Sequence, residues 1–144
     1  MTETTSYNNR QQMISMSATR AGTALLALGL FYCPGQASSC ATNNGNLISQ
    51  SISHAQIGTS GQPEYEAALN LTQNYGSGAL DGYDALNRLV KFSEGGASRD
   101  FAYDRYGNVW VSSNTGLPLN GLTPQAQSWF NAADNRLTAV GYDA

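Results

Sequence analysis

The stretch YDALNRL at residues 83–89 returns twenty positions later as YDRYGNV at residues 103–109. Both copies read Tyr-Asp, two variable residues, a pair of turn-forming residues and an aliphatic residue. The aspartate can accept a hydrogen bond from the backbone two residues on, and Asn or Gly tolerates the positive φ of a tight turn. Each copy is therefore predicted to end one strand, turn tightly and begin the returning strand. The residues of this repeat motif are Tyr83, Asp84, Asn87, Arg88, Leu89, Tyr103, Asp104, Gly107 and Asn108.

Weaker copies of the motif occur on both sides of this pair. They are YNNR at 7–10, NNGNL at 43–47, FNAADNRL at 130–137 and YDA at 142–144. Short alternating segments follow the motifs and predict strands. The predicted strands are 47–52, 89–93, 109–112 and 137–140. A Glu-Gly-Gly turn at 94–96 joins one hairpin to the next. The pattern predicts a meandering antiparallel sheet with about 20 residues per hairpin.

The composition favours the same class of fold. Charged residues make up 12% of the 144 residues, which is about half the usual share. The abundant Asn, Ser, Thr, Gly and Gln favour turns over helices, because their side chains compete for backbone hydrogen bonds. Eight tyrosines and two tryptophans add β propensity. We therefore expect one all-β domain, a meander of antiparallel β-hairpins with one or two short helices.

Two segments fit the hairpin pattern poorly. Residues 64–71 follow a proline and read either as one or two helical turns or as an irregular strand, with helix slightly favoured. Residues 122–130 read as a short helix or a loop, with Thr123 as its N-cap and Pro124 at its first position.

The one apolar run, residues 21–33, is too short for a transmembrane helix, which needs about 20 residues. We interpret it as a strand buried on both faces and not as the core of a signal peptide. The two cysteines, Cys33 and Cys40, flank a Pro-Gly turn. They are either a disulfide, which would suit an exported protein, or two free thiols. A metal site is not expected, because His54 is the only histidine and has no ligand spacing to Cys40.

Charge and motifs argue against several function classes. A net charge of −3 without any basic run gives no footprint for nucleic acid or for a membrane surface. No Gly-x-Ser-x-Gly nucleophile motif is present, and GTSG at 58–61 has the wrong spacing. No glycine pair is followed by the Lys-Ser/Thr of a phosphate loop. We predict that the chain is not an enzyme, has no catalytic residues and uses no cofactor.

The pair of motifs at 83–89 and 103–108 resembles the YD repeat of RHS proteins. That family includes the shell components of bacterial toxin complexes and the animal teneurins. The resemblance is strong over 83–112 and fair over 41–52 and 130–144. Residues 53–82 are interpreted as an irregular insertion, and the whole chain, 1–144, as a single partial repeat array.

The resemblance implies a β-sheet that spirals into a hollow shell or serves as a cell-surface scaffold. In the parent protein such a sheet would enclose or display a C-terminal toxin or effector domain. The implied partners are the remaining repeats or the enclosed cargo, and the implied location is secreted or at the cell surface. The resemblance also makes the repeat residues structural: Tyr83 and Tyr103 would stack along the sheet, and Asp84 and Asp104 would hold the turns.

A cell-surface module that binds carbohydrate or a partner protein is the alternative function. Its aromatic platform would come from Tyr75, Tyr103, Tyr106, Trp110 and Trp129. The same aromatic side chains would equally serve as cross-strand pairs that stabilise a sheet. Because the terminal hairpins of an array leave strand edges open, we also expect marginal stability or self-association of the isolated chain.

Overall fold

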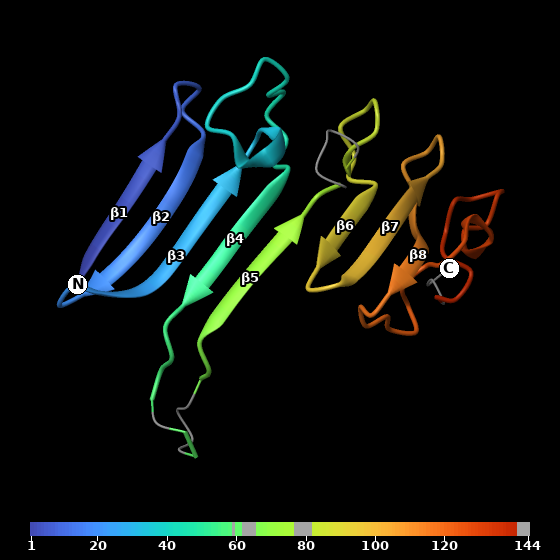
Figure 1. Cartoon of the computed structure of the whole chain (residues 1–144). Coiled ribbons are helices and arrows are strands. Elements are labelled where there is room, and N and C mark those ends of the chain that lie inside the picture. The colour runs from blue at the N-terminus through green and yellow to red at the C-terminus, as the bar shows by residue number, and fades with distance from the viewer. Residues whose placement is uncertain (59, 62–65, 77–81, 141–144) are drawn as a thin grey trace.

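The fold is an open, single-layer sheet of eight antiparallel strands, in the order β1 to β8 (Figure 1). It comes from a computed structural model that describes residues 1–58, 60–61, 66–76 and 82–140. The strands are β1 (Thr2–Tyr7), β2 (Met13–Arg20), β3 (Thr23–Phe31), β4 (Ser49–His54), β5 (Leu69–Asn74), β6 (Lys91–Glu94), β7 (Ala97–Tyr103) and β8 (Val109–Thr115). Each strand pairs with the next one along the chain, so the predicted all-β meander of hairpins is confirmed.

The predicted strands mostly lie within one or two residues of the observed ones. The segments at 47–52, 89–93 and 109–112 correspond to β4, β6 and β8, and the apolar run at 21–33 contains β3. The strand predicted at 137–140 is wrong, since only an isolated bridge joins Leu137 to Phe130. Among the described residues, no further strand runs alongside 137–140 to supply a hydrogen-bonded ladder.

The structure also decides the two segments that fit the hairpin pattern poorly, and the slight preference for helix at 64–71 is wrong. Within 64–71, Glu66 bridges to Ile57 and Leu69 begins β5, while residues 64 and 65 lie outside the described part. The neighbouring strand β4 offers a full antiparallel ladder to β5, and this tertiary pairing overrides a weak helical preference. Within 122–130 only the short 3-10 turn η3 (Gln127–Trp129) forms. Its N-cap is Ala126 and not the expected Thr123, and Pro124 lies before it, with its carbonyl accepting a hydrogen bond from the backbone N–H of Val111 in β8.

The side chains of the sheet separate into two different faces. Successive residues of a strand point to opposite faces, and paired residues share a face. One face carries Met16, Leu26, Leu28, Leu30, Ile52 and Leu71, which we call the apolar face, and His54 and Gln50 lie beside Leu26 and Leu30 on it. The other carries small or polar residues such as Ser17, Ala27 and Ser53 in one cross-strand row.

Few side chains are buried in this single layer. The buried apolar residues of the described chain are Cys33, Ile48 and Val111. Residues 25–31 of β3 are half-buried, so the interpretation of this segment as a strand buried on both faces is wrong. No described segment covers the sheet as a second layer would (Figure 1). No helix of the described residues is long and apolar enough to cross a membrane.

Candidate functional site: a row of turns along one edge of the sheet

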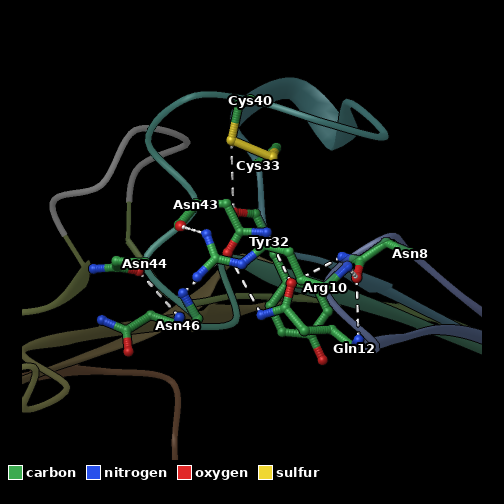
Figure 2. The surroundings of a disulfide bond; sticks show 10 residues. Asn8, Arg10, Gln12, Tyr32, Cys33, Cys40, Asn43, Asn44 and Asn46 are labelled. Carbon is green, nitrogen blue, oxygen red and sulfur yellow. Dashed lines mark hydrogen bonds between the residues drawn. A yellow bond between two sulfur atoms is a disulfide. The ribbon is translucent and has the colours of Figure 1, made fainter.

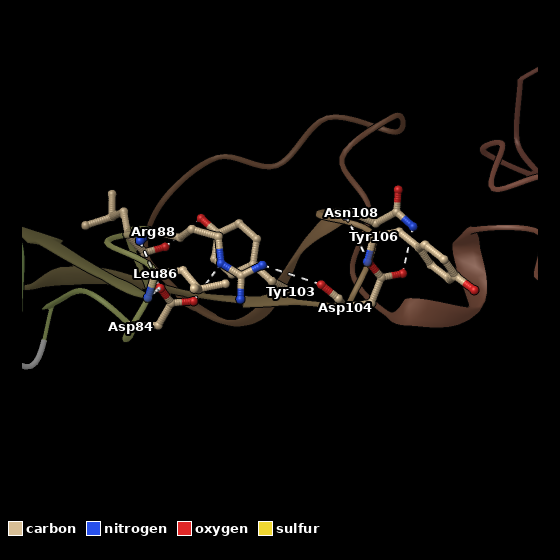
Figure 3. A network of polar contacts seen from close by, with 8 residues as sticks. Asp84, Leu86, Arg88, Tyr103, Asp104, Tyr106 and Asn108 are labelled. Atoms are coloured by element: carbon tan, nitrogen blue, oxygen red, sulfur yellow. Dashed lines mark hydrogen bonds and ion pairs between the residues drawn. The ribbon is translucent and has the colours of Figure 1, made fainter.

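The first motif forms a closed turn around the carboxylate of Asp84. One carboxylate oxygen accepts hydrogen bonds from the backbone N–H groups of Leu86 and Arg88, both at 2.9 Å. The backbone of Asp84 also exchanges hydrogen bonds with the chain across the turn, donating to Arg88 and accepting from Asn87. Asn87 has a φ of 60°, which Asn tolerates better than most residues. The second carboxylate oxygen pairs with the Arg88 guanidinium at 2.6 Å (Figure 3).

The second motif repeats this turn bond for bond. Asp104 accepts from the backbone N–H of Tyr106 at 2.8 Å and of Asn108 at 3.0 Å. Gly107 takes the position with positive φ, at 89°. Here the side-chain amide of Asn108 replaces the arginine and donates to the free carboxylate oxygen at 2.7 Å (Figure 3). The two aspartates therefore hold their turns, as the resemblance implied.

Two of the weaker copies use an asparagine in the same position. The side-chain oxygen of Asn8 accepts from the backbone of Arg10 and Gln12, and Gln11 has a φ of 60°. Asn131 accepts from the backbone of Ala133 in a turn that is one residue longer, and its backbone bonds to that of Arg136. An amide oxygen supplies the same acceptor as a carboxylate, which explains why Asn can replace Asp here.

The turn contacts also change the acidity of both carboxyl groups. A hydrogen bond from the backbone of Arg88 is the largest influence on Asp84, and with the bonds from the Arg88 side chain and Leu86 it lowers the pKa. For Asp104 partial desolvation raises the pKa, but the hydrogen bonds from Asn108, Tyr106 and Gly107 together outweigh it and the pKa is lowered. Both groups are therefore ionised at neutral pH and act as acceptors.

The tyrosine of each motif joins its turn to the residue that directly follows the preceding turn. The Tyr103 hydroxyl donates to the carbonyl of Leu89 at 2.7 Å, and the Tyr83 hydroxyl donates to the carbonyl of Leu47 at 2.8 Å. Leu89 and Leu47 occupy the same place, directly after a motif turn. Desolvation raises the pKa of both phenols, so both remain protonated donors at neutral pH.

The implied stacking of the motif tyrosines is wrong in its detail. The Arg88 guanidinium lies over the Tyr103 ring, 4.3 Å from its centre. The described ring pair of the sheet is instead Tyr75 with Phe92, at 5.8 Å. A guanidinium on an aromatic face is attracted by the ring electrons, so Arg88 both closes its own turn and packs against the next copy.

Side chains connect each turn to the next along this edge. Asn44 and Asn46 donate to the Asn87 side chain, Arg88 donates to the carbonyl of Asp104 at 3.4 Å, and Asn108 donates to Asn135. At the other end, Arg10 donates to the carbonyl of Asn43, whose amide donates to Gln12 at 2.8 Å. The turn row, residues 8–12, 43–46, 84–88, 104–108 and 131–136, is thus linked turn to turn. Its members at 8–12, 84–88 and 104–108 lie on the same side of the sheet, where the strands of successive hairpins end (Figure 1).

The two cysteines close the loop that precedes 43–46. Cys33 and Cys40 form a disulfide with their Cα atoms 5.7 Å apart (Figure 2), within the normal range. Cys33 is buried, with 2% of its surface exposed, and the loop contains the 3-10 turn η1 (Pro34–Gln36). The bridge lies above the hydrogen-bonded cluster of Asn8, Gln12 and Asn43, so it holds the loop over the turn row (Figure 2).

An aromatic groove lies between the second motif and the C-terminal turn. It has a volume of about 720 Å³ and is lined by Tyr103, Tyr106, Trp110 and Phe130 together with polar groups of Asp104 and Asn131. Three of the five aromatic residues expected from the sequence therefore meet in one place. The other two, Tyr75 and Trp129, are not part of this groove.

No metal-binding cluster of His, Cys, Asp and Glu is found among the described residues. The Nδ1 atom of His54 contacts the carbonyl oxygen of Ala55 at 2.9 Å. The carboxylates of the repeat motifs are engaged by their own turns, as described above.

Sequence reasoning found the turns but not their connections. The asparagines at 8 and 131 carried a usable signal, because each follows an aromatic residue at the position of the motif aspartate. The contacts of Leu47 with Tyr83 and of Asn46 with Asn87 had no such signal, because more than 35 residues separate the partners.

Comparison with known proteins adds no assignment: no family model, no curated protein and no solved structure matches this chain.

Proposed function

We propose that this chain is a structural segment of a β-hairpin array of the RHS/YD-repeat type. Its role is to form part of a shell or cell-surface scaffold, which in the parent protein encloses or displays a C-terminal toxin or effector domain. The observation that carries the proposal is the turn row, in which the same hydrogen-bonded turn recurs and each member contacts the next. In this proposal the repeat residues carry architecture and no catalysis.

The hydrogen-bond partners of the motif side chains support a structural role in preference to an enzymatic one. The polar groups of the motifs bond to their own turn or to the neighbouring turn, as for Asp84, Arg88 and Asp104. Strands bond only to their neighbours in the sheet, so that hairpins can be added without changing the rest. The single layer leaves two extended faces, one apolar and one small and polar, as a wall between two environments would.

As part of this proposal, the chain is exported to an oxidising compartment. A disulfide persists outside the cytosol, and the Cys33–Cys40 bridge encloses a short loop next to the turn row. Fractionation of the producing cells, followed by labelling of free thiols with and without reduction, tests the location. We expect an extracellular or surface-bound chain that is labelled only after reduction; a labelled cytosolic chain would contradict it.

The DNA that flanks the reading frame provides the direct test of the array. Further Tyr-Asp hairpins in frame, followed by an unrelated C-terminal domain, are the expected result. If the flanking sequence encodes neither hairpins nor an effector domain, the shell proposal loses its support.

A carbohydrate-binding module is a second candidate, and the aromatic groove is the observation that favours it. Aromatic faces such as Tyr106 and Trp110 can pack on sugar rings, and nearby amides and carboxylates can bond to hydroxyl groups. A glycan array followed by calorimetry tests it, comparing Trp110→Ala with the control Leu86→Ala at an exposed turn position outside the groove. Binding that is lost only in Trp110→Ala supports the module, and absence of any binding by the folded chain rejects it.

A further inference from the structure

The sequence contains two Asn-Gly pairs, Asn44-Gly45 and Asn120-Gly121. In such a pair the backbone nitrogen of the glycine can attack the side-chain carbonyl carbon of the asparagine, because glycine has no Cβ atom to hinder the approach. All four residues are exposed, so water reaches both pairs. The pairs differ in the hydrogen bonds that engage the attacking nitrogen and the attacked amide.

The first pair is held by hydrogen bonds that oppose this reaction. The N–H of Gly45 donates to the side-chain oxygen of Asn43 at 2.9 Å, and Asn43 is buried. The side-chain nitrogen of Asn44, which would leave as ammonia, donates to Asn87 at 3.3 Å. One donor, the backbone N–H of Asn46 at 3.1 Å, reaches the side-chain oxygen of Asn44. Attack by Gly45 therefore first requires that its bond to Asn43 be broken.

The second pair lacks these restraints. Within the described part of the chain, no hydrogen bond engages the N–H of Gly121 or the side-chain nitrogen of Asn120. The Oδ1 atom of Asn120 accepts two hydrogen bonds, from the backbone N–H of Leu122 at 2.9 Å and from the hydroxyl of Thr123 at 3.0 Å. Donors at a carbonyl oxygen stabilise the negative charge that develops there when a nucleophile adds to the carbon. This pair therefore combines an unengaged nucleophile with a polarised carbonyl group.

We propose that Asn120 is a site of spontaneous deamidation in the folded chain, with water as the co-reactant. The Gly121 nitrogen gives its proton to solvent and forms a bond to Cγ of Asn120, while Oδ1 takes up the negative charge. The bond from Cγ to Nδ2 then breaks, and Nδ2 takes a proton from solvent and leaves as ammonia. One water molecule opens the resulting cyclic imide at either carbonyl and leaves aspartate or isoaspartate.

The modification changes a turn that places the chain beside β8. The backbone carbonyl of Asn120 accepts from the N–H of Thr123 at 3.1 Å, and the carbonyl of the next residue, Pro124, accepts from Val111 in β8. Either product adds a negative charge to this turn, and isoaspartate also lengthens its backbone by one carbon atom. Asn120 lies outside the turn row and does not line the aromatic groove, so the proposal does not depend on the shell assignment.

Peptide mapping of the full chain after incubation in mildly alkaline buffer tests the proposal. Mass spectrometry measures the replacement of NH2 by OH at each Asn-Gly pair, and water enriched in heavy oxygen labels the products formed during the incubation. We expect Asn120 to react at least about tenfold faster than Asn44 in the folded chain, the rate equivalent of one to two ordinary hydrogen bonds. In urea with reductant, where both pairs are unfolded, the two rates should approach each other. A folded-state ratio equal to the unfolded ratio, or a faster reaction at Asn44, would overturn the proposal.

Substitutions at Thr123 test the contribution of its hydroxyl group. Thr123→Val keeps the shape of the side chain but removes the donor to Asn120, so it should slow the folded-state reaction about fivefold, as the loss of one hydrogen bond does. The matched control is Thr123→Ser, which keeps the donor and should react like the parent. Neither substitution should change the rate in urea. Equal folded-state rates in all three chains would show that the hydroxyl does not stabilise the charge on Oδ1 and would overturn that role.

Discussion

At the scale of single residues, one acceptor atom organises each repeat. The side-chain oxygen of Asp84 or Asp104 bonds to two backbone N–H groups of its turn, and Asn8 does the same with an amide oxygen. The requirement is therefore a short side chain with an acceptor, and the charge is secondary. Replacing these aspartates with asparagine should therefore change the pH dependence of stability without preventing the turns from forming.

The lowered pKa of both aspartates makes stability depend on acid pH. A carboxyl group whose pKa is lower in the folded chain stabilises it above the unfolded value, which is about 3.9. This stabilisation is lost as pH falls through the lower, folded pKa. We expect Asp84→Asn combined with Asp104→Asn to fold normally at pH 7 and to lose less stability than the parent on acidification below about pH 4.

Urea denaturation at several pH values measures this difference. Asp134→Asn is the control, since its carboxylate oxygen accepts one backbone bond, from Arg136 at 3.2 Å, and not two. Equal acid sensitivity of the double variant and the parent would show that other groups set the pH dependence.

Gly82 has the least space for a Cβ atom among the compared glycines of the described residues. A Cβ atom at this position would lie 1.8 Å from the backbone oxygen of Tyr75. We expect Gly82→Ala to lower the free energy of unfolding by about 1–3 kcal/mol, the usual cost of overpacking. Gly121→Ala is the control, because an added Cβ there meets nothing within 4 Å. Chemical denaturation of both variants measures the difference, and equal stability would rule out the close approach.

At the scale of elements, two of the hairpins are closed by a tyrosine contact that joins their two ends. Tyr103 bonds to Leu89 across the β6–β7 hairpin, and Tyr83 bonds to Leu47 across the β4–β5 hairpin. The second of these spans residues 53–82, where the sequence predicted an irregular insertion and the structure instead places the end of β4 and all of β5. The disulfide performs a similar closure where the loop before 43–46 is long.

The tyrosine contacts predict a small, specific loss of stability. We expect Tyr103→Phe to cost about 0.5–1.5 kcal/mol, because it removes one hydrogen bond while keeping the ring under Arg88. Tyr7→Phe, at a residue that is 62% exposed, should be close to neutral. Thermal unfolding of the two variants checks this, and an equal effect at both positions would contradict it.

The disulfide predicts a larger effect. Loop-closure entropy suggests that the bridge contributes about 2–3 kcal/mol for a loop of this length. We expect Cys33→Ala combined with Cys40→Ala to lower the free energy of unfolding by about this amount. Reduction of the parent chain should lower it as well. Urea denaturation with and without reductant measures it. If reductant left the parent unchanged, the loop would be held by the hydrogen bonds around Asn43 alone.

At the scale of the whole molecule, the sheet is held together mainly between neighbouring strands. Three apolar side chains of the described residues are buried, so little stability comes from a shared core. A chain of this kind gains stability from anything that binds its folded form. We therefore expect the Tm to rise with protein concentration, as measured by calorimetry between about 1 and 100 μM. A sharp melt that is independent of concentration would contradict the expected self-association.

Local chemistry made much of the fold predictable. The repeated Tyr-Asp motifs, the turn residues Asn87 and Gly107 and the alternation after each turn were enough for an all-β meander, since turns and strand faces depend on residues close together in the sequence. The failures at 64–71 and 137–140 have a common cause. Whether a segment becomes a strand depends on the presence of a partner, and that is decided by the rest of the sheet.

The tertiary structure alone decided what the repeats do together. The sequence determined the individual turns, because an aspartate, its backbone donors and a residue with positive φ lie within five positions. The linkage of the turns into one row, the aromatic groove and the exposure of the apolar face all join residues from different hairpins. Those contacts depend on strand register and on the absence of a covering layer among the described residues, and local sequence patterns contain neither.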